Sequence, residues 1–275
     1  MYELSCNATM FKADIDNARA ILGGICWSQG LHTFKRLVYY AGPPQPHQKG
    51  LPNLEHVTQI PPPPNNQPSR PHPAWNALSD ELTRSSYVLC LAYNVSPEKD
   101  FGSEADVDLN TVPGTLQWFD FPDPLKGQPF TQRRKLEIPG QGNLPMVMAD
   151  NKYEFDKELI EETWSFVKKD EKEIPTKGDF EIAFTRYFKL PETDVEPSTQ
   201  VVRLPAWSDL APLDPAENWW VSIRSFAWEE KKPEEVKKAA SQILEEKTNF
   251  DRFFKFEPVD RKDLDTRVPP PSRTM

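Results

Sequence analysis

The sequence is poor in the residues that hold metals or build disulfide frameworks. It contains three cysteines and four histidines in 275 residues. No histidine lies three or four residues from another histidine or a cysteine, the spacing typical of zinc sites. The odd cysteine count, with each cysteine in an apolar setting, indicates reduced thiols of the cytosol or nucleus. We therefore expect no metal site and no disulfide scaffold.

Long apolar runs are also missing. No stretch of 18 or more apolar residues is present to span a membrane. The first ten residues carry no basic cluster of the kind that opens a secretory leader, and Lys12, Asp14 and Asp16 interrupt any apolar stretch that follows. We expect a soluble intracellular protein that makes no membrane contact.

Positive charge is scarce as well. The chain has 33 Lys and Arg against 42 Asp and Glu, a net charge of −9. Binding to nucleic acid through its phosphates needs a basic face. The best local candidate is Arg133-Arg134-Lys135, but three charges at the start of a predicted strand are more often solvated. We expect no direct sequence-specific contact with nucleic acid.

The common catalytic motifs are absent. The sequence has no Gly-x-Ser-x-Gly nucleophile elbow and no glycine-rich phosphate or dinucleotide loop. Cys26-Trp27 only echoes a cysteine-protease pattern, since no histidine lies beyond position 72 to act as its base. Gly140-Gln-Gly142 is followed by Asn-Leu-Pro and is interpreted as a turn. We predict no catalytic, cofactor-binding or metal-binding residues, and no cofactor.

What the sequence does contain is 29 prolines together with 16 Phe, 8 Trp and 7 Tyr. The aromatics gather in short runs such as Tyr87–Tyr93, Phe180–Phe188 and Trp219–Trp228. The prolines, about twice their usual ~5% share, gather in the polar stretches between these runs. Proline cannot donate to a sheet ladder, so it marks the loops. The pattern predicts a β-rich core with long, stiff surface loops.

The first 73 residues predict a strand, a helix, a second strand and an insert. Alternation at Tyr2–Ala8 indicates a strand with one buried face. Helical spacing runs from Asp14 to a stop at Gly23-Gly24, and Leu37–Tyr40 forms the next strand. Residues 42–73 hold eleven prolines. This proline-rich insert is interpreted as a stiff or disordered loop in preference to a polyproline ligand.

The middle of the chain predicts one helix and several strands. The helix covers Ala74–Arg84, and the strands cover Tyr87–Tyr93, Pro113–Phe121 and Phe130–Ile138. Residues 140–150 are predicted to be a loop.

Residues 158–168 fit two structures. Ile160, Trp164 and Val167 fit a helix, whereas Trp164 and Phe166 also fit strand alternation. We favour a hairpin that pairs this segment with Phe180–Phe188, and the helix stays open as the alternative.

The last third predicts a loop over 191–217, a long strand at Trp219–Trp228 and a helix at Pro233–Lys247. Proline in the first helical turn and acidic residues after it suit the positive end of the helix dipole. A last strand is predicted at Phe253–Phe256.

One class of β-barrel enzyme needs its own test. Tunnel-type triphosphate hydrolases point glutamates into an antiparallel barrel to hold metal, with Glu-x-Glu-x-Lys on a strand. Here Glu171-Lys-Glu173 lies in a predicted turn, and Pro175 stands in place of the lysine. A barrel interior lined by several glutamates with Lys or Arg would favour the hydrolase. An apolar or unpatterned interior would favour a scaffold.

Several stretches together resemble a known family. They are Tyr2–Ser5, Pro113–Trp118 with Phe121–Pro124, Asp150–Phe155 and Asp260–Val268. In this order and spacing they resemble subunit 18 of the Mediator of RNA polymerase II transcription, in its filamentous-fungal form.

The resemblance implies a β-dominated α+β fold: an antiparallel β-barrel with a few flanking helices, shaped like the tunnel hydrolases but without catalysis. It also implies a nuclear, non-enzymatic scaffold in the Mediator head module that supports initiation by RNA polymerase II. The implied partners are subunit 20 and the C-terminal helix of subunit 8. We expect one domain over 1–268 with the insert at 42–73, and a frayed tail over 269–275.

Four tryptophans are candidates for partner binding, because interface anchors are enriched in Trp, Tyr and Arg. They are Trp164, Trp219, Trp220 and Trp228. Strand neighbours point to opposite faces, so Trp219 and Trp220 cannot both enter the barrel. The one outside is covered either by a helix of this chain or by a partner. The alternatives to the scaffold are a divergent tunnel-type hydrolase and an adaptor that presents its polyproline insert.

Overall fold

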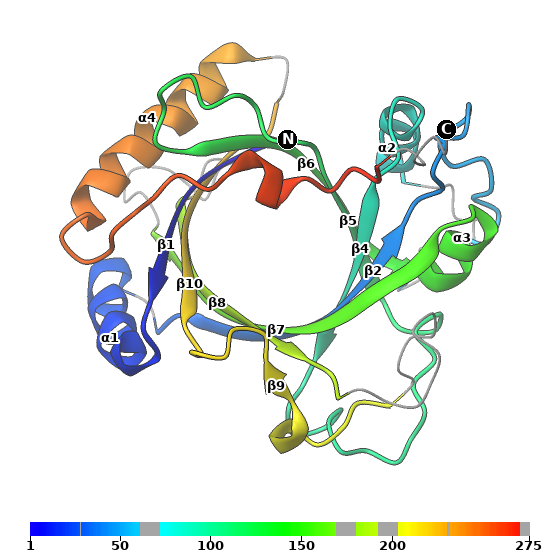
Figure 1. The fold of residues 1–275 in the computed structure, drawn as a ribbon, viewed down its shortest axis with the longest axis horizontal. Helices are drawn as coiled ribbons and strands as arrows, with labels where there is room; N and C mark the ends of the chain where they lie inside the picture. The colour runs from blue at the N-terminus through cyan, green and yellow to red at the C-terminus, as the bar shows by residue number, and fades with distance from the viewer. Residues whose placement is uncertain (28, 61–71, 169–179, 192–202, 230–231, 270–275) are drawn as a thin grey trace, which may run out of the picture.

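The structure is a computed structural model that describes residues 1–27, 29–60, 72–168, 180–191, 203–229 and 232–269. In this part of the chain, eight antiparallel strands close into a barrel with helices outside it (Figure 1). The strand order around the barrel is β1-β10-β8-β7-β2-β4-β5-β6, and β6 pairs back with β1. The fold class predicted from the sequence is confirmed.

The barrel strands have these bounds: β1 (Tyr2–Met10), β2 (Leu31–Ala41), β4 (Val88–Val95), β5 (Gly114–Phe119), β6 (Thr131–Gly142), β7 (Glu154–Lys168), β8 (Phe180–Lys189) and β10 (Trp219–Ala227). Two short strands extend the sheet, β3 (Thr58–Gln59) beside β6 and β9 (Ala211–Pro212) beside β8. The α-helices of the described residues are α1 (Ile15–Cys26), α2 (Ala74–Leu82), α3 (Leu144–Asp150) and α4 (Pro233–Phe250). None of these helices is long and apolar enough to cross a membrane.

The apolar core lies on the outer face of the barrel, beneath the helices. On one side, α1 and α4 cover β1 and β10, and Leu4, Leu22 and Ile243 are fully buried in the same cluster. On the other side, α2 and α3 cover β4 to β6 through a second cluster that contains Trp75 and Trp118. Successive strand residues point to opposite faces. The alternate residues therefore point into the barrel, where charged side chains lie beside a small apolar cluster of Leu37, Cys90 and Ala92.

The hairpin favoured over a helix at residues 158–168 is confirmed. Strand β7 pairs with β8 from Leu159↔Lys189 to Lys168↔Phe180. Trp164 and Phe166 lie on the same face of β7, as alternation requires, and Phe166 is buried in the cluster beneath α1. The connecting residues 169–179, which include Glu171 and Glu173, lie outside the described residues.

The predicted stop of the first helix at Gly23-Gly24 is wrong. Helix α1 continues to Cys26 and ends at Trp27, which takes the left-handed conformation with φ 49°. Glycine inside a helix costs only about 1 kcal/mol. Burial of Leu22 and packing of Ile25 and Cys26 against the barrel outweigh that cost.

The predicted loop at 140–150 is also wrong. Strand β6 runs through Gly140 and Gly142, and Asn143, with φ 58°, turns the chain into α3. Leu144 and Val147 of α3 are fully buried against the barrel. The burial of these two side chains stabilises a helix that is too short for its sequence pattern to reveal.

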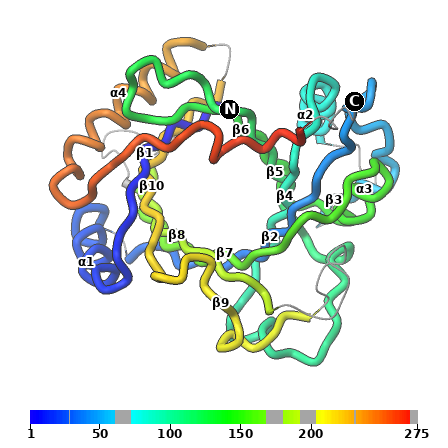
Figure 2. Tube along the Cα trace, viewed as in Figure 1, coloured from blue at the N-terminus to red at the C-terminus, as the bar shows by residue number. Residues whose placement is uncertain are grey.

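The predicted strand at Phe253–Phe256 is not formed. Phe254 and Phe256 are buried in the cluster beside α4, and only an isolated bridge, Asn7↔Glu257, follows them. From there the C-terminal segment crosses the end of the barrel past β1 and β6 towards α2 (Figures 1 and 2). We call residues 257–269 the C-terminal strap.

The insert predicted over 42–73 is partly packed where the structure describes it. Leu51 and Val57 are buried in the cluster beneath α2 and α3. Gly50 lies so close to α2 that a Cβ would come within 2.0 Å of the Ser79 carbonyl oxygen. Residues 61–71, with the four consecutive prolines, lie outside the described residues.

Candidate functional sites: the charged barrel interior and the groove beside helix α1

The barrel interior is lined by charged side chains of both signs. Strand alternation and register place four carboxylates and four cations on the inner face: Glu3, Glu137, Glu161 and Glu181, with Lys35, Arg133, Lys135 and Arg224. They come from β1, β2, β6, β7, β8 and β10. Residues from six strands therefore meet in one interior.

These eight charges neutralise one another in ion pairs. Glu3 contacts Arg133 at 2.9 Å and Lys135 at 3.4 Å. A second arm of this network joins Lys135 to Glu137 at 3.0 Å. Two further pairs join neighbouring strands, Lys35–Glu161 at 3.8 Å and Arg224–Glu181 at 3.3 Å. Every glutamate of the described interior is thus within ion-pair distance of a cation.

Glu3 has the most perturbed carboxyl group of this network. Burial alone would raise its pKa, but Lys135, Arg133 and Arg224 overcome this effect and lower the pKa to about 2. Glu3 is therefore ionised throughout the physiological range. Its negative charge therefore balances the positive charges of Arg133 and Lys135.

The charges of the interior do not distinguish a hydrolase from a scaffold by the criterion that we drew from the sequence. The barrel is lined by several glutamates with Lys and Arg, the pattern that was expected to favour the enzyme. However, the glutamates are paired with cations, and no group of three His, Cys, Asp or Glu in the described residues could hold a metal. The interior by itself therefore does not separate a scaffold from a hydrolase.

The basic triplet Arg133-Arg134-Lys135 is split between the two faces of β6. Arg133 and Lys135 point inward to Glu3, whereas Arg134 points outward and contacts Glu81 at 2.5 Å and Asp120 at 3.8 Å. The three cations are therefore neutralised on opposite faces and form no continuous track for phosphates.

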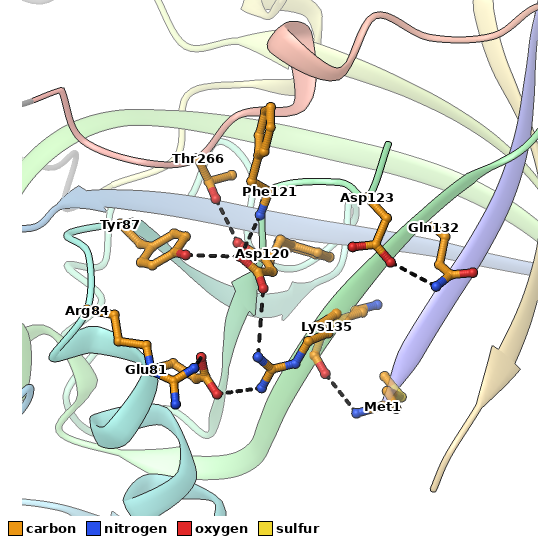
Figure 3. Close-up of polar contacts among 12 residues, drawn as sticks. Met1, Glu81, Arg84, Tyr87, Asp120, Phe121, Asp123, Gln132, Lys135 and Thr266 are labelled. Atoms are coloured by element: carbon orange, nitrogen blue, oxygen red, sulfur yellow. Dashed lines mark hydrogen bonds and ion pairs between the residues drawn. The ribbon is translucent and has the colours of Figure 1, made fainter. Parts of the chain in front are cut away.

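Asp120 is the centre of a polar network at the rim of the barrel. It accepts hydrogen bonds from the Tyr87 hydroxyl at 3.0 Å and from the Phe121 N–H at 2.8 Å (Figure 3). Burial, and then Asp120, raise the pKa of Tyr87. Nearby, the Thr266 hydroxyl of the strap donates to the Phe119 carbonyl oxygen at 2.7 Å. This network ties the strap to β4 and β5.

The four tryptophans predicted to bind partners lie in different environments. Trp219 is 3% exposed and lies in the cluster beneath the helices, whereas Trp220 points to the opposite face and is 39% exposed. The expected opposition of these two side chains is thus observed, and this chain itself covers the outer one. Trp228 is 45% exposed beyond the end of β10. Trp164 is half-buried and lines a groove.

An open groove of about 920 Å³ runs along one face of α1. One wall consists of residues spaced along that helix face: Asp16, Arg19, Ala20, Gly23 and Trp27. The other wall comes from the start of β2 and from β7: Gln29, Gly30, His32 and Trp164. We call it the α1 groove.

Trp164 is held in the groove wall by contacts with its ring. The Arg19 guanidinium carbon lies 3.4 Å from the ring centroid, and the His32 ring is stacked on it at 3.9 Å with an interplanar angle of 12°. His32 Nε2 lies 2.9 Å from Glu162, which also accepts a bond of 2.7 Å from Arg186. These contacts fix the wall before any partner arrives.

Trp27 is the groove residue that the sequence pattern missed. Its side chain is 93% exposed, although tryptophan carries one of the largest apolar surfaces. The residue follows the end of α1, outside any periodic pattern, so alternation and helical spacing say nothing about it. The only available signal was its position just after a helix.

The fold is thus a closed antiparallel barrel with ion-paired charges in its interior and a groove on its outer face. The sequence matches the family model described as "Med18 protein" over residues 2–267. The chain therefore belongs to the Med18 family. Med18 is a non-enzymatic, nuclear subunit of the Mediator head module and acts in transcription by RNA polymerase II, which confirms the predicted function, location and lack of catalysis.

A solved structure of the Mediator head module shows the same fold at low sequence identity. The chain is similar to a chain of the Schizosaccharomyces pombe Mediator head module, with 12% identity, a TM-score of 0.59, and coverage of 94% of this chain and 99% of that one. It is also similar to the PH1819 protein from Pyrococcus horikoshii OT3, with 8% identity, a TM-score of 0.44, and coverage of 95% and 97%. Comparison with curated protein sequences gave no match.

Proposed function

We propose that this chain is the filamentous-fungal form of the head-module scaffold and that it holds two partners. It pairs with subunit 20 and receives the C-terminal helix of subunit 8. Through them it contacts the RNA polymerase II machinery indirectly. Support for the fungal assignment comes from the motifs quoted above, among them Pro113–Trp118 and Asp260–Val268.

The observation that carries the proposal of partner binding is the apolar surface around α1. Phe11, Ile21, Trp27 and Leu31 precede, belong to or follow this helix, and all four are exposed. Large exposed apolar side chains mark protein contacts when they form one patch, and we propose that these four do so. A scaffold of a multi-subunit complex needs such a surface, whereas an isolated soluble barrel gains nothing from it.

Trp164, Trp220 and Trp228 are the proposed partner contacts among the predicted tryptophans. Trp164 lies on the outside of the barrel and Trp228 beyond the end of β10, whereas Trp220 is 39% exposed on the inner face near the start of β10, and residues of this type commonly anchor interfaces. Trp219 is covered by its own chain and supports the barrel from beneath. We also propose that residues 1–268 form one domain and that 269–275 is a dispensable tail.

The test is co-expression of the chain with subunits 8 and 20, followed by size-exclusion chromatography. We expect a ternary complex that contains all three chains. A chain that elutes as a monomer in the presence of both would reject the proposed partners. Trp220→Ala and Trp228→Ala are expected to weaken one of the two contacts, and Glu104→Gln, on an exposed loop, serves as the matched control.

A further inference from the structure

We propose that Ser103 is a phosphorylation site for an acidophilic protein kinase and that Arg203 binds the resulting phosphate. The modification concerns this chain alone, so it goes beyond the proposed function and holds whichever subunits bind the chain. Three observations carry it: an exposed loop, the acidic residues that follow the serine, and a cation beside it.

Ser103 lies in a loop that is accessible but held at both ends. Residues 103–108 form neither a helix nor a strand, and most of them are exposed. Before the loop, Phe101 pairs with Leu204 in an isolated bridge. After the loop, Leu109 is buried in the cluster beneath the helices. A kinase can therefore bind the loop without unfolding the barrel.

The residues that follow the serine are acidic. In the segment Ser103-Glu-Ala-Asp-Val-Asp108, carboxylates occupy three of the five positions after the hydroxyl, and Asp106 stands at the third. Acidophilic kinases bind such carboxylates with basic side chains of their own, and charge patterns of this kind determine kinase specificity. Asp106 and Asp108 are both exposed, so both carboxylates are available for that contact.

Thr248 shows that spacing alone does not make such a site. Asp251 stands three positions after it, as Asp106 does after Ser103. However, Thr248 lies inside α4, and its hydroxyl donates to the Leu244 carbonyl oxygen at 2.9 Å. A kinase would have to unwind the helix to reach this hydroxyl. Thr248 therefore provides a matched control for Ser103.

Arg203 is placed to bind the phosphate. Ser103 and Arg203 line the same cavity of about 300 Å³. Their chain neighbours are joined, since the Gly102 N–H donates to the Leu204 carbonyl oxygen at 3.1 Å. Arg203 already pairs with Asp106, and its hydrogen bond lowers the pKa of that carboxyl group. A guanidinium group that binds a carboxylate binds a phosphate dianion in the same forked geometry.

The reaction takes one phosphoryl group from Mg-ATP. The Ser103 hydroxyl gives its proton to the catalytic aspartate of the kinase, and its oxygen bonds to the γ-phosphorus. The bond from that phosphorus to the β,γ-bridging oxygen breaks, and ADP leaves. The product carries a charge of about −2 at pH 7. Arg203 then exchanges Asp106 for the phosphate, which fastens the loop to the segment around Leu204.

The first test is phosphorylation of the purified full chain, expressed in bacteria, with casein kinase 2 and Mg-ATP. Every protein carries Thr193→Ala, because that threonine also precedes acidic residues and lies outside the described residues. Tandem mass spectrometry should locate the phosphate on Ser103. Ser103→Ala should abolish it, and Asp106→Asn should slow it by about tenfold, because the kinase loses a charge contact. Thr248→Ala should leave the rate unchanged.

Three results would overturn the site. One is a native chain that carries no phosphate on Ser103 after this treatment. Another is phosphorylation of a synthetic peptide of residues 98–110 but not of the folded chain, which would show that the fold hides the serine. The third is an equal rate for the wild-type loop and Asp106→Asn, which would reject recognition through acidic residues. Equal melting temperatures of the variants exclude unfolding as the cause.

The second test measures the contact with Arg203. The pKa of a phosphoserine, ordinarily about 6, is read from the ³¹P chemical shift of the phosphorylated chain across a pH titration. It should be about 0.5 higher in Arg203→Gln, because a nearby cation favours the dianion. Lys126→Gln, which removes an exposed cation from another loop, should leave it unchanged.

Equal phosphate pKa values with and without the Arg203 guanidinium would overturn its role as the receptor. Arg203→Lys should keep part of the effect, since it retains the charge but not the fork. No other subunit is present in either measurement, so failure here is distinct from failure of the co-expression test.

Discussion

Glu3 on β1 and Arg133 on β6 form an ion pair of 2.9 Å inside the barrel, across the seam where the first strand meets the sixth. The ladder at this seam is short, from Tyr2↔Arg134 to Ser5↔Thr131. The backbone N–H of Lys135 extends it by donating to the Met1 carbonyl oxygen at 2.9 Å. Closure of the barrel therefore depends on a few contacts between residues some 130 positions apart.

We predict that Glu3→Gln destabilises the chain in a pH-dependent way. The folded-state pKa of Glu3, about 2, lies below its ordinary value of 4.5. Its stabilising contribution is therefore fully present above pH 4.5 and is lost as the pH falls towards 2. Two to three pKa units correspond to about 3 kcal/mol. Urea unfolding should show a gap of that size at pH 7 that closes near pH 2.

A matched control for this prediction is Glu104→Gln, on an exposed loop, which should show no such gap at any pH. A gap for Glu3→Gln that stays constant from pH 7 to pH 2 would contradict the assigned role of its charge.

We predict that removal of residues 258–275 weakens the barrel, whereas removal of 270–275 does not. The strap takes part in several hydrogen bonds with strand ends: Val88 N–H to Thr266 O at 2.7 Å, Val268 N–H to Ser86 O at 2.9 Å, Thr266 Oγ1 to Phe119 O at 2.7 Å and Arg261 Nε to Pro122 O at 2.8 Å. At about 1 kcal/mol each, their loss amounts to a few kcal/mol. Thermal melts of both truncations measure this difference, and equal melting temperatures would contradict it.

We predict that Arg36→Ala is among the most damaging single substitutions. Arg36 on β2 and Glu158 on β7 form an ion pair in which both side chains are buried. Removal of one partner leaves an uncompensated buried charge, which costs about 3–5 kcal/mol. Denaturant unfolding should show this loss, and Arg36→Met with Glu158→Leu should recover much of it.

The control for this pair is Arg203→Ala, which breaks the exposed contact with Asp106 and should leave the free energy of unfolding almost unchanged, because solvent screens exposed charges. If Arg36→Ala costs no more than Arg203→Ala, the buried pair does not have the role assigned here.

We predict that the three thiols differ in reactivity. Burial raises the pKa of Cys6 to about 11, and burial together with Glu161 raises that of Cys90 to about 12. Both thiols therefore stay protonated at pH 8, and only the thiolate attacks alkylating reagents. Cys26 is half-buried at the end of α1. Mass spectrometry after brief iodoacetamide treatment should find label on Cys26 first, and urea should expose all three.

Alkylation of Cys6 or Cys90 in the native chain at the rate of Cys26 would show that the barrel wall opens more readily than its packing indicates. Cys26→Ser should abolish the native labelling.

The strands were predictable wherever one face is apolar over several residues. Alternation identified Tyr2–Ala8 and favoured the β7–β8 hairpin, because a barrel strand with a core on its outer face has a period of two. The same reasoning missed α3, since seven residues hold too few turns to show helical periodicity. It also misjudged Gly23-Gly24, because tertiary burial of neighbouring residues can offset a poor helix propensity.

The site was less predictable than the fold. Composition identified tryptophan as the anchor type, but it could not separate buried Trp219 from exposed Trp228. It also gave no hint that Trp27 faces Trp164 across a groove. Residues so far apart in the chain come together only through the path of the barrel.

By itself, the sequence determined the β-rich class, the loops marked by proline, the lack of catalytic motifs and the order of the family motifs. These features depend on local periodicity and composition, which neighbouring residues carry. Only the tertiary structure decided that the glutamates of the barrel face cations, that the core lies outside the barrel and that α1 leaves a groove open. The physical reason is that alternation defines two faces of a strand, but closure of the sheet decides which face becomes the interior and which charges meet there.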